Sequence, residues 1–319
     1  MTAVTEHRLD GFEPDNLLAF LALLGLLRTL EAARPDWRPR AGWTVDDPPV
    51  RPILRLRTAE ASETVLSAVV DGLRGLVAHH DFGGARDLTF SVAEAREHLQ
   101  RAVRTSRRDA DLWASLVSDA ALSSKGDKVE PTPLCLMFGQ GHQHFLDRLA
   151  TAPRLLTPPP RGEGRRKTAI SETECLREAL FDEWTRPDAT SSFRWDPHED
   201  VRYALRANDP TDPKTKETTQ HGANRLASVG LACLTVMPVF RGGAARLGII
   251  GGRRDARGTF TFVWPIWRLP ASLAAIAAFL DHPGLDDERV RASLGIVERR
   301  MAKRISVGKF MNFTRAELI

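Results

Sequence analysis

The feature that most limits the fold of this chain is an apolar run near its start. Residues 17–27 are apolar at every position except Gly25, and apolar character continues to Leu30. A helix needs about 20 apolar residues to cross a bilayer, so this run is too short to span one. Helices that are apolar all round are buried inside proteins. We therefore expect residues 17–30 to form a core helix, with Asp15 or Asn16 as its N-cap and Pro35 beyond its end.

Composition places the chain among globular proteins of a reducing compartment. It has 319 residues, 42% of them hydrophobic, which is enough for one large domain or two smaller ones. Cys135, Cys175 and Cys233 are odd in number and lie far apart, a pattern that supports neither a disulfide framework nor a zinc ribbon. Glu6 and Asp10 make the leader acidic, unlike a secretory signal. We expect a cytoplasmic protein with no membrane contact.

Basic residues are unevenly distributed along the chain. The formal net charge is +4, made up of −2 from residues 1–160 and +6 from residues 161–319. Only 7 of the 45 basic residues are lysine. The planar fork of arginine suits phosphates and base edges better than the point charge of lysine. The excess is consistent with nucleic-acid binding, although a GC-rich gene would also favour arginine.

Hydrophobic periodicity predicts a helix-rich α+β fold with small antiparallel sheets and no βαβ periodicity. We expect extended segments at 53–57 and 193–205, and a hairpin formed by 246–250 and 259–264 with a basic tip at 251–258. A basic tail should follow Asp286. The expected helices after the first cover residues 59–80, 92–104, 109–122, 142–149, 171–184, 223–234 and 270–280.

The best internal boundary is a stretch rich in proline, glycine and arginine. Residues 158–160 are three prolines, and residues 161–167 read Arg-Gly-Glu-Gly-Arg-Arg-Lys. Such a stretch cannot supply a hydrophobic core. We therefore predict a helix-rich α+β region at 1–157, a flexible basic loop at 158–168 and a basic α+β region at 169–319.

Catalytic motifs are absent: the sequence has no Walker loop, dinucleotide fingerprint, nucleophile elbow or zinc-protease helix. His142 and His144 flank a glycine-rich turn, and with Cys135 and Asp147 they could hold a metal. The alternative is a structural loop at a helix start.

Two further clusters have competing readings. His79 and His80 with Asp81 resemble the His–Asp pair of a metal-dependent nuclease, but histidines also end helices favourably. The carboxylates of Asp196, Glu199 and Asp200 could bind magnesium, whereas the flanking arginines Arg194 and Arg202 favour ion pairing. We expect no catalytic residue, no metal and no cofactor.

Basic side chains on loops and tips are the candidate nucleic-acid contacts, because such positions can reach a phosphate backbone or a groove. Nearby amides at Gln140, Gln143, Asn208, Gln220 and Asn224 could add base contacts. The candidate contact residues are Arg161, Arg165, Arg166, Lys167, Lys214, Lys216, Asn224, Arg225, Arg253, Arg254, Arg257, Arg299, Arg300, Lys303, Arg304 and Lys309.

Several stretches resemble one known family in the same order along the chain. The opening Leu9-Asp10-Gly11 with Pro14, the run at 17–30 and Trp43 resemble the start of CRISPR-associated large-subunit proteins of the type I-G (formerly I-U) group. Residues 133–149 are similar to that group's glycine-rich motif followed by a helix. Residues 193–205 resemble its Arg-(Phe/Trp)-Asp-Pro…Asp-Arg-(Arg/Tyr)-Tyr-Ala-Leu signature, and residues 222–226 and 264–267 extend the likeness.

This resemblance implies a subunit of an RNA-guided surveillance complex called Cascade. Such a subunit recognises the protospacer-adjacent motif of target double-stranded DNA, helps to open the duplex and recruits a helicase-nuclease, while guide RNA reads the sequence. Other effector subunits would be its partners. The competing hypotheses are a CRISPR RNA-processing or metal-dependent nuclease, and a backbone subunit that coats the guide RNA.

Overall fold

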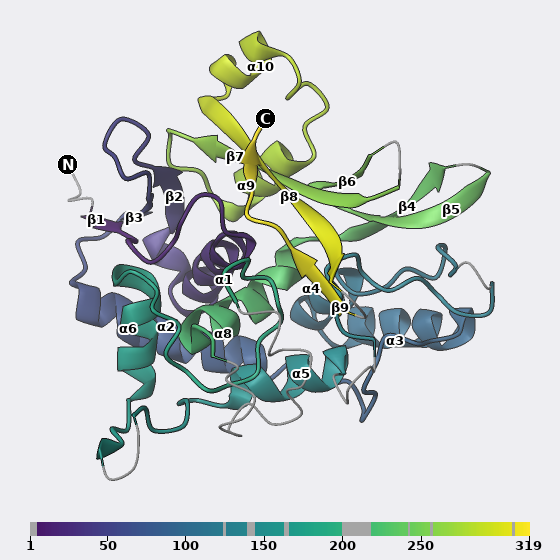
Figure 1. Ribbon diagram of the computed structural model, residues 1–319, viewed down its shortest axis with the longest axis horizontal. Helices are drawn as coiled ribbons and strands as arrows, with labels where there is room; N and C mark the ends of the chain where they lie inside the picture. Colours follow the sequence, from purple (N-terminus) through teal and green to yellow (C-terminus); the bar gives the residue numbers. More distant parts are fainter. Residues whose placement is uncertain are drawn as a thin grey trace.

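The computed structural model describes residues 5–123, 126–138, 144–162, 166–199, 218–241, 243–255, 258–307 and 310–319. Helices surround one buried helix, α1 (Leu17–Ala33), and small antiparallel sheets flank them (Figure 1). This arrangement confirms the predicted α+β class.

Helix α1 is the predicted core helix, and its start is fixed by Asn16. The Asn16 side-chain oxygen accepts hydrogen bonds from the backbone N–H groups of Leu18 (2.9 Å) and Ala19 (3.4 Å). The helix ends at Ala33, before Pro35, because a proline disfavours helical geometry in the residue that precedes it. In the described part of the chain, no helix has the length and apolar character needed to cross a membrane.

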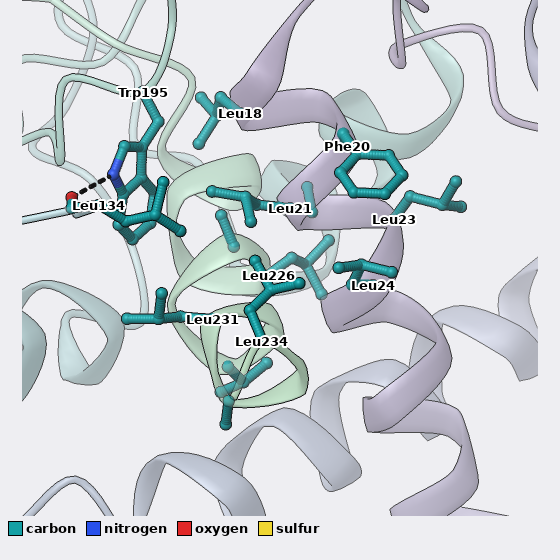
Figure 2. Packing of buried hydrophobic residues seen from close by; sticks show 14 of the residues in the cluster. Leu18, Phe20, Leu21, Leu23, Leu24, Leu134, Trp195, Leu226, Leu231 and Leu234 are labelled. Carbon is teal, nitrogen blue, oxygen red and sulfur yellow. Dashed lines mark hydrogen bonds between the residues drawn. The ribbon is translucent and has the colours of Figure 1, made fainter. Parts of the chain in front are cut away.

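Helix α8 (His221–Gly230) crosses α1 at very close range. A Cβ atom on Gly25 would lie 1.9 Å from the Leu226 carbonyl oxygen, and one on Gly230 would lie 2.0 Å from that of Leu21. Leucines from both helices pack beside this crossing (Figure 2). Because α1 and α8 come from opposite sides of the predicted loop at 158–168, the two predicted regions share one core.

The remaining helices cover this pair. Helix α2 (Ser62–Val77) packs against α1, and α6 (Glu172–Phe181) packs against both α8 and α2. The others are α3 (Val92–Thr105), α4 (Arg107–Ala114), α5 (Phe145–Thr151) and the 3-10 turns η1 (Pro35–Trp37), η3 (Ala152–Arg154) and η5 (Leu231–Cys233). The predicted helix at 109–122 is too long, since α4 stops at Ala114 and the chain turns at Ser115.

Two larger sheets flank the helices, besides the two-stranded sheet of β4 and β5. The N-terminal sheet has the order β1-β3-β2, from β1 (Thr5–Arg8), β3 (Pro52–Leu56) and β2 (Arg40–Trp43). The C-terminal sheet has the order β10-β8-β7-β6, with β9 (Phe310–Phe313) also paired to β8. Its strands are β6 (Gly252–Arg254), β7 (Phe260–Trp267), β8 (Ile296–Val307) and β10 (Glu317–Leu318).

Strand β7 joins the C-terminal sheet to the helical core. Phe20 of α1 stacks on Trp264 of β7 with ring centroids 5.4 Å apart, and the Trp264 indole N–H donates to the Pro14 carbonyl (3.0 Å). Helix α9 (Leu273–Leu280) packs against β7, and α10 (Glu288–Ser293) precedes β8.

The predicted hairpin is wrong in its pairing. Strand β5 (Ala244–Ile249) pairs with β4 (Val236–Arg241), whereas β7 pairs with β6, so there are two hairpins where one was expected. The predicted basic tail is also wrong, because β8 is an internal strand between β7 and β10. The predicted extended segment at 193–205 is irregular as far as residue 199, and residues 200–205 lie outside the described residues.

Candidate nucleic-acid interface

The sixteen predicted contact residues are not gathered on one surface. Five of them, Arg165, Lys214, Lys216, Arg257 and Lys309, lie outside the described residues. The other eleven divide into buried residues, residues paired with carboxylates or carbonyls, and exposed residues.

Asn224 and Arg225 are buried in α8, each with 1% of its surface exposed, which is a correction to their assignment as nucleic-acid contacts. The Arg225 guanidinium donates to Glu172 (2.7 Å) and to the Pro153 carbonyl (3.0 Å). The Asn224 side-chain amide donates to the Thr219 hydroxyl (2.6 Å). Both side chains therefore hold neighbouring segments together and have no surface left for an outside ligand.

The predicted basic loop is closed at its base by the chain itself. Backbone hydrogen bonds join Arg161 and Thr168 in both directions (2.9 and 2.8 Å). The Arg161 guanidinium pairs with Asp188 (2.7 Å) and Glu178 (2.8 Å), so this arginine anchors the loop. Arg166 and Lys167 are exposed.

The basic side chains of β8 bind carboxylate or carbonyl groups of the protein itself. Three of them form ion pairs, and the fourth, Arg304, donates to the Pro133 carbonyl (2.9 Å). Because carboxylates offset three of these charges, β8 is a weak candidate for phosphate contact. The pairs are Arg299–Asp286 (2.7 Å), Arg300–Glu298 (2.6 Å) and Lys303–Glu317 (2.9 Å).

The exposed predicted residue Arg253 lies in a cleft between the two hairpins, here called the β5–β6 cleft. It has a volume of about 330 Å3. Arg246 and Leu247 of β5, Val239 of β4, Arg253 and Arg254 of β6 and Phe260 of β7 line it. Arg246 was not predicted, and it completes a set of three arginines.

A sharp corner between β5 and β6 creates this cleft. Gly251 adopts the left-handed conformation (φ 78°), where a Cβ atom would lie 3.1 Å from both the Phe262 ring and the Val263 carbonyl oxygen. Only glycine tolerates this conformation at so little cost. The corner is fixed by the Val263 N–H, which donates to the Gly251 carbonyl (2.8 Å).

The floor of the cleft combines an aromatic ring with arginine. The guanidinium carbons of Arg304 and Arg254 lie 5.5 and 6.0 Å from the centroid of the Phe260 ring. Burial lowers the pKa of Arg304, and the nearby charge of Arg254 lowers it further. Glu130 pairs with Arg254 (3.3 Å) and accepts the Leu247 N–H (2.7 Å). Arg246 and Arg253 have no ion pair among the described residues.

The β4–β5 hairpin extends from the body at one end of the long axis of the molecule (Figure 1). Phe240 is 80% exposed and Val239 is 46% exposed. Exposed apolar side chains on a projecting hairpin next to arginines resemble the wedges that nucleic-acid-binding proteins insert between bases. The sequence signal for this hairpin was the apolar run 236–240 followed by Gly242 and Gly243.

The histidines considered as metal ligands have local partners. His79 pairs with Asp109 (3.2 Å), and His144 pairs with Asp87 (2.6 Å). His80 is buried and bonded to the Leu149 carbonyl (2.9 Å), and burial lowers its pKa to about 4. Residue 142 lies outside the described residues. Within the described ranges, no three His, Cys, Asp or Glu side chains are grouped to hold a metal.

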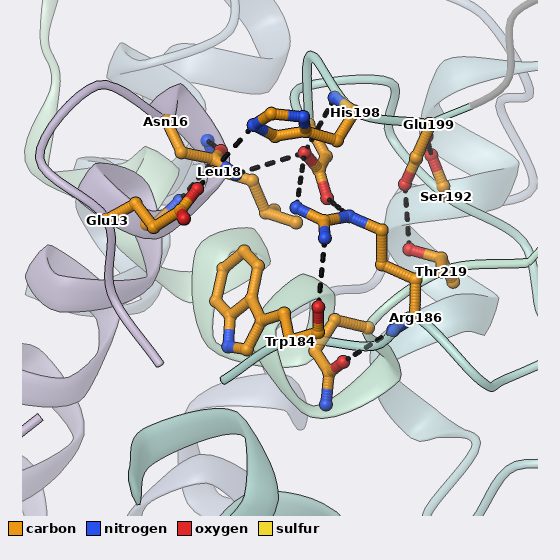
Figure 3. A network of polar contacts seen from close by, with 12 residues as sticks. Glu13, Asn16, Leu18, Trp184, Arg186, Ser192, His198, Glu199 and Thr219 are labelled. Carbon is orange, nitrogen blue, oxygen red and sulfur yellow. Dashed lines mark hydrogen bonds and ion pairs between the residues drawn. The ribbon is translucent and has the colours of Figure 1, made fainter. Parts of the chain in front are cut away.

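The carboxylates considered for magnesium also have partners. Asp196 is buried and accepts from Arg186 (2.7 Å), from the Asn16 amide (3.0 Å) and from the backbone N–H of His198 (3.0 Å). Figure 3 labels the three donor residues Arg186, Asn16 and His198. The sequence favoured ion pairing with the flanking Arg194 and Arg202, whereas the arginine that pairs with Asp196 is Arg186. Asp200 and Arg202 lie outside the described residues.

Each of the five predicted base-contacting amides either lies outside the described residues or is buried. Gln140, Gln143 and Asn208 lie outside the described residues, whereas Gln220 is 2% exposed and its side-chain oxygen accepts the backbone N–H of Arg186 (3.2 Å).

No protein-family model matches the chain, and no curated protein matches it.

Proposed function

We propose that this protein is a non-catalytic DNA-binding subunit of an RNA-guided type I CRISPR surveillance complex, and that it contacts nucleic acid through the β5–β6 cleft. The observation that carries the DNA contact is the convergence of Arg246, Arg253 and Arg254 on a cleft beside the projecting β4–β5 hairpin. Arginine forks bind phosphate oxygens in pairs and also read guanine in the major groove.

The geometry supports different roles for the arginines and for Phe240 on this surface. Arg246 and Arg253 form no ion pair within the described ranges, which leaves their guanidiniums available to a phosphate backbone. The pKa of the Asp286 carboxyl is lowered mainly by Arg299 and further by the charge of Arg253, which lies close enough to act on it. Phe240 at the exposed tip supplies an apolar wedge that could unstack a base step and help to open a duplex. We propose that the same arginines recognise the protospacer-adjacent motif.

Membership of a CRISPR complex is supported by the sequence resemblance. The residues that carry it are mostly core residues: Trp195, Trp264 and Trp267 are each fully buried. We propose that these buried residues maintain a fold shared with that family and that the exposed arginines make the nucleic-acid contacts. Guide RNA, other effector subunits and the helicase-nuclease are the partners proposed on this basis.

The test is co-expression with the neighbouring genes, followed by duplex binding at several salt concentrations. Replacement of both Arg246 and Arg253 by alanine should lower the slope of log affinity against log salt by about 2, since each lost duplex phosphate contact removes roughly 0.9. Arg289→Ala is the matched control, because Arg289 is exposed on α10 and has no ion pair in the described part of the chain. Phe240→Ala should reduce duplex opening more than duplex binding.

Two results would overturn this proposal. One is recovery of the protein without guide RNA or any partner subunit. The other is an unchanged salt slope in the double arginine variant. Incubation with RNA and DNA, with and without a chelator, tests the competing nuclease hypothesis in the same preparation.

A further inference from the structure

We infer that a second site, on the outer face of the β1-β3-β2 sheet, binds the backbone phosphates of a nucleic-acid strand. Four arginines, Arg38, Arg40, Arg55 and Arg57, line a groove of about 410 Å3, here called the arginine groove. Ligand-binding clefts in proteins typically measure about 300 to 1,000 Å3. The exposed side chain of Leu269 forms part of the rim.

Strand pairing brings these arginines together from two separate stretches of sequence. Arg40 of β2 and Arg55 of β3 are direct cross-strand partners. Arg57 directly follows β3, and its backbone N–H donates to the Trp37 carbonyl (2.8 Å). Arg38 follows Trp37 in the left-handed conformation (φ 47°). Each of the four side chains is exposed.

The protein offsets the charge of only one of these four arginines with an ion pair among the described residues. Like charges directly opposite each other on paired strands are destabilising, and Arg40 faces Arg55 in this way. On the side of β1, Glu6 forms an ion pair with Arg55 (3.5 Å). Within the described ranges, Arg38, Arg40 and Arg57 have no ion pair. The basic residues of β8 are different, because three of them are paired with carboxylates.

An anionic ligand would relieve this repulsion, and phosphate is the anion that the guanidinium fork fits best. Four guanidiniums spread over a turn and two strands can reach more than one phosphate, which favours a strand over a single ion. The choice of nucleic acid as the phosphate source rests on the proposed function. The β1-β3-β2 sheet, which carries the arginine groove, and the β4–β5 hairpin lie at opposite ends of the long axis (Figure 1), so the two sites can be tested separately.

The test measures binding of a single-stranded oligonucleotide of mixed sequence to the full chain. The variant carries Arg40→Thr and Arg57→Ala together, and Arg289→Ala is the control. Affinity should fall about a hundredfold, because two arginines are lost and each hydrogen bond to a charged group is worth about one decade of affinity. The salt slope should fall by about 1.4, since each single-strand phosphate contact contributes roughly 0.7.

Loss of folding can be separated from loss of binding. Arg40→Thr alone removes one of two facing positive charges and adds a residue that favours strands, so it should raise the midpoint of thermal unfolding without ligand. A variant that melts higher and binds more weakly supports the inference.

Parallel titrations with inorganic phosphate and with a mononucleotide identify the source of the phosphate. Tighter binding of the oligonucleotide than of either small ligand supports a nucleic-acid strand. Phosphate binding without an effect of the variant on the oligonucleotide overturns the inference. If only the Arg246 and Arg253 variant loses affinity, the arginine groove is excluded while the proposed function stands; the opposite result excludes the β5–β6 cleft instead.

Discussion

Replacement of Gly25 by alanine should destabilise the protein, although alanine is the better helix former. In an open helix this change gains about 0.5 to 1 kcal/mol. At Gly25 the new methyl group would lie 1.9 Å from the Leu226 carbonyl oxygen and 3.2 Å from the Gly230 nitrogen. Both atoms belong to the backbone of α8, so neither can rotate away as a side chain could.

Helix α8 cannot retreat easily from the added methyl group. Arg225 ties it to Glu172 and to the Pro153 carbonyl, and buried leucines fill the layer around the crossing. Overpacking of a well-packed core costs about 1 to 3 kcal/mol, and a clash between two backbones belongs at the upper end. After the gain in helix propensity is subtracted, we expect a net loss of about 2 kcal/mol.

Gly75 provides a matched control within α2. It is exposed, and a Cβ atom placed there would have no atom within 4 Å. Gly75→Ala should therefore stabilise the protein by about 0.5 to 1 kcal/mol. Urea unfolding followed by tryptophan fluorescence measures both variants, and thermal midpoints should move by roughly 2 °C per kcal/mol in opposite directions. Equal shifts of the same sign, or a Gly25→Ala variant as stable as the parent, would refute this reasoning.

Three further predictions concern buried polar groups. Asn16→Ala should cost about 2 to 4 kcal/mol in urea unfolding, because it removes the cap of α1 and one donor to buried Asp196, whereas Ser91→Ala at the exposed cap of α3 should cost about 1. The pKa of His80 is about 4 in the folded protein and 6.5 when unfolded, so the unfolded state takes up the proton first as pH falls; the free energy of unfolding should decrease from pH 6.5 towards 4, and less steeply in His80→Gln. Arg225→Ala should cost about 3 kcal/mol, because it leaves Glu172 buried with one partner fewer, yet gel-shift affinity for DNA should not change in the folded variant.

The helices were predictable because their signals are local. Asn16 before an apolar run and Pro35 after it define α1 within a few residues. The pairing of the strands was harder to predict, since the local sequence does not indicate which strand pairs with which. Gly251 and Gly252 were read as the tip of one hairpin, but Gly251 is the corner between two hairpins.

The second source of error was the interpretation of basic residues that lie on a strand. The basic residues of β8 suggested a solvated tail, but neighbouring carboxylates pair with three of them and let the strand lie inside a sheet. The arginine groove had a signal that was overlooked. Arginines recur two residues apart, at 38 and 40 and again at 55 and 57, but Arg38 is left-handed and precedes β2, and only the pairing of β2 with β3 brings the two sets together.

The close crossing of α1 and α8 has a consequence for synthesis of the chain. The ribosome makes α1 early, and its partner Gly230 emerges only after a further 10 to 40 s or so at ordinary translation rates of about 5 to 20 residues per second. Helix α2 emerges much sooner and can cover one side of α1. The side that carries Leu21 and Gly25 must wait for α8. A nascent chain shorter than this exposes an apolar helix face, which is the kind of surface that chaperones bind.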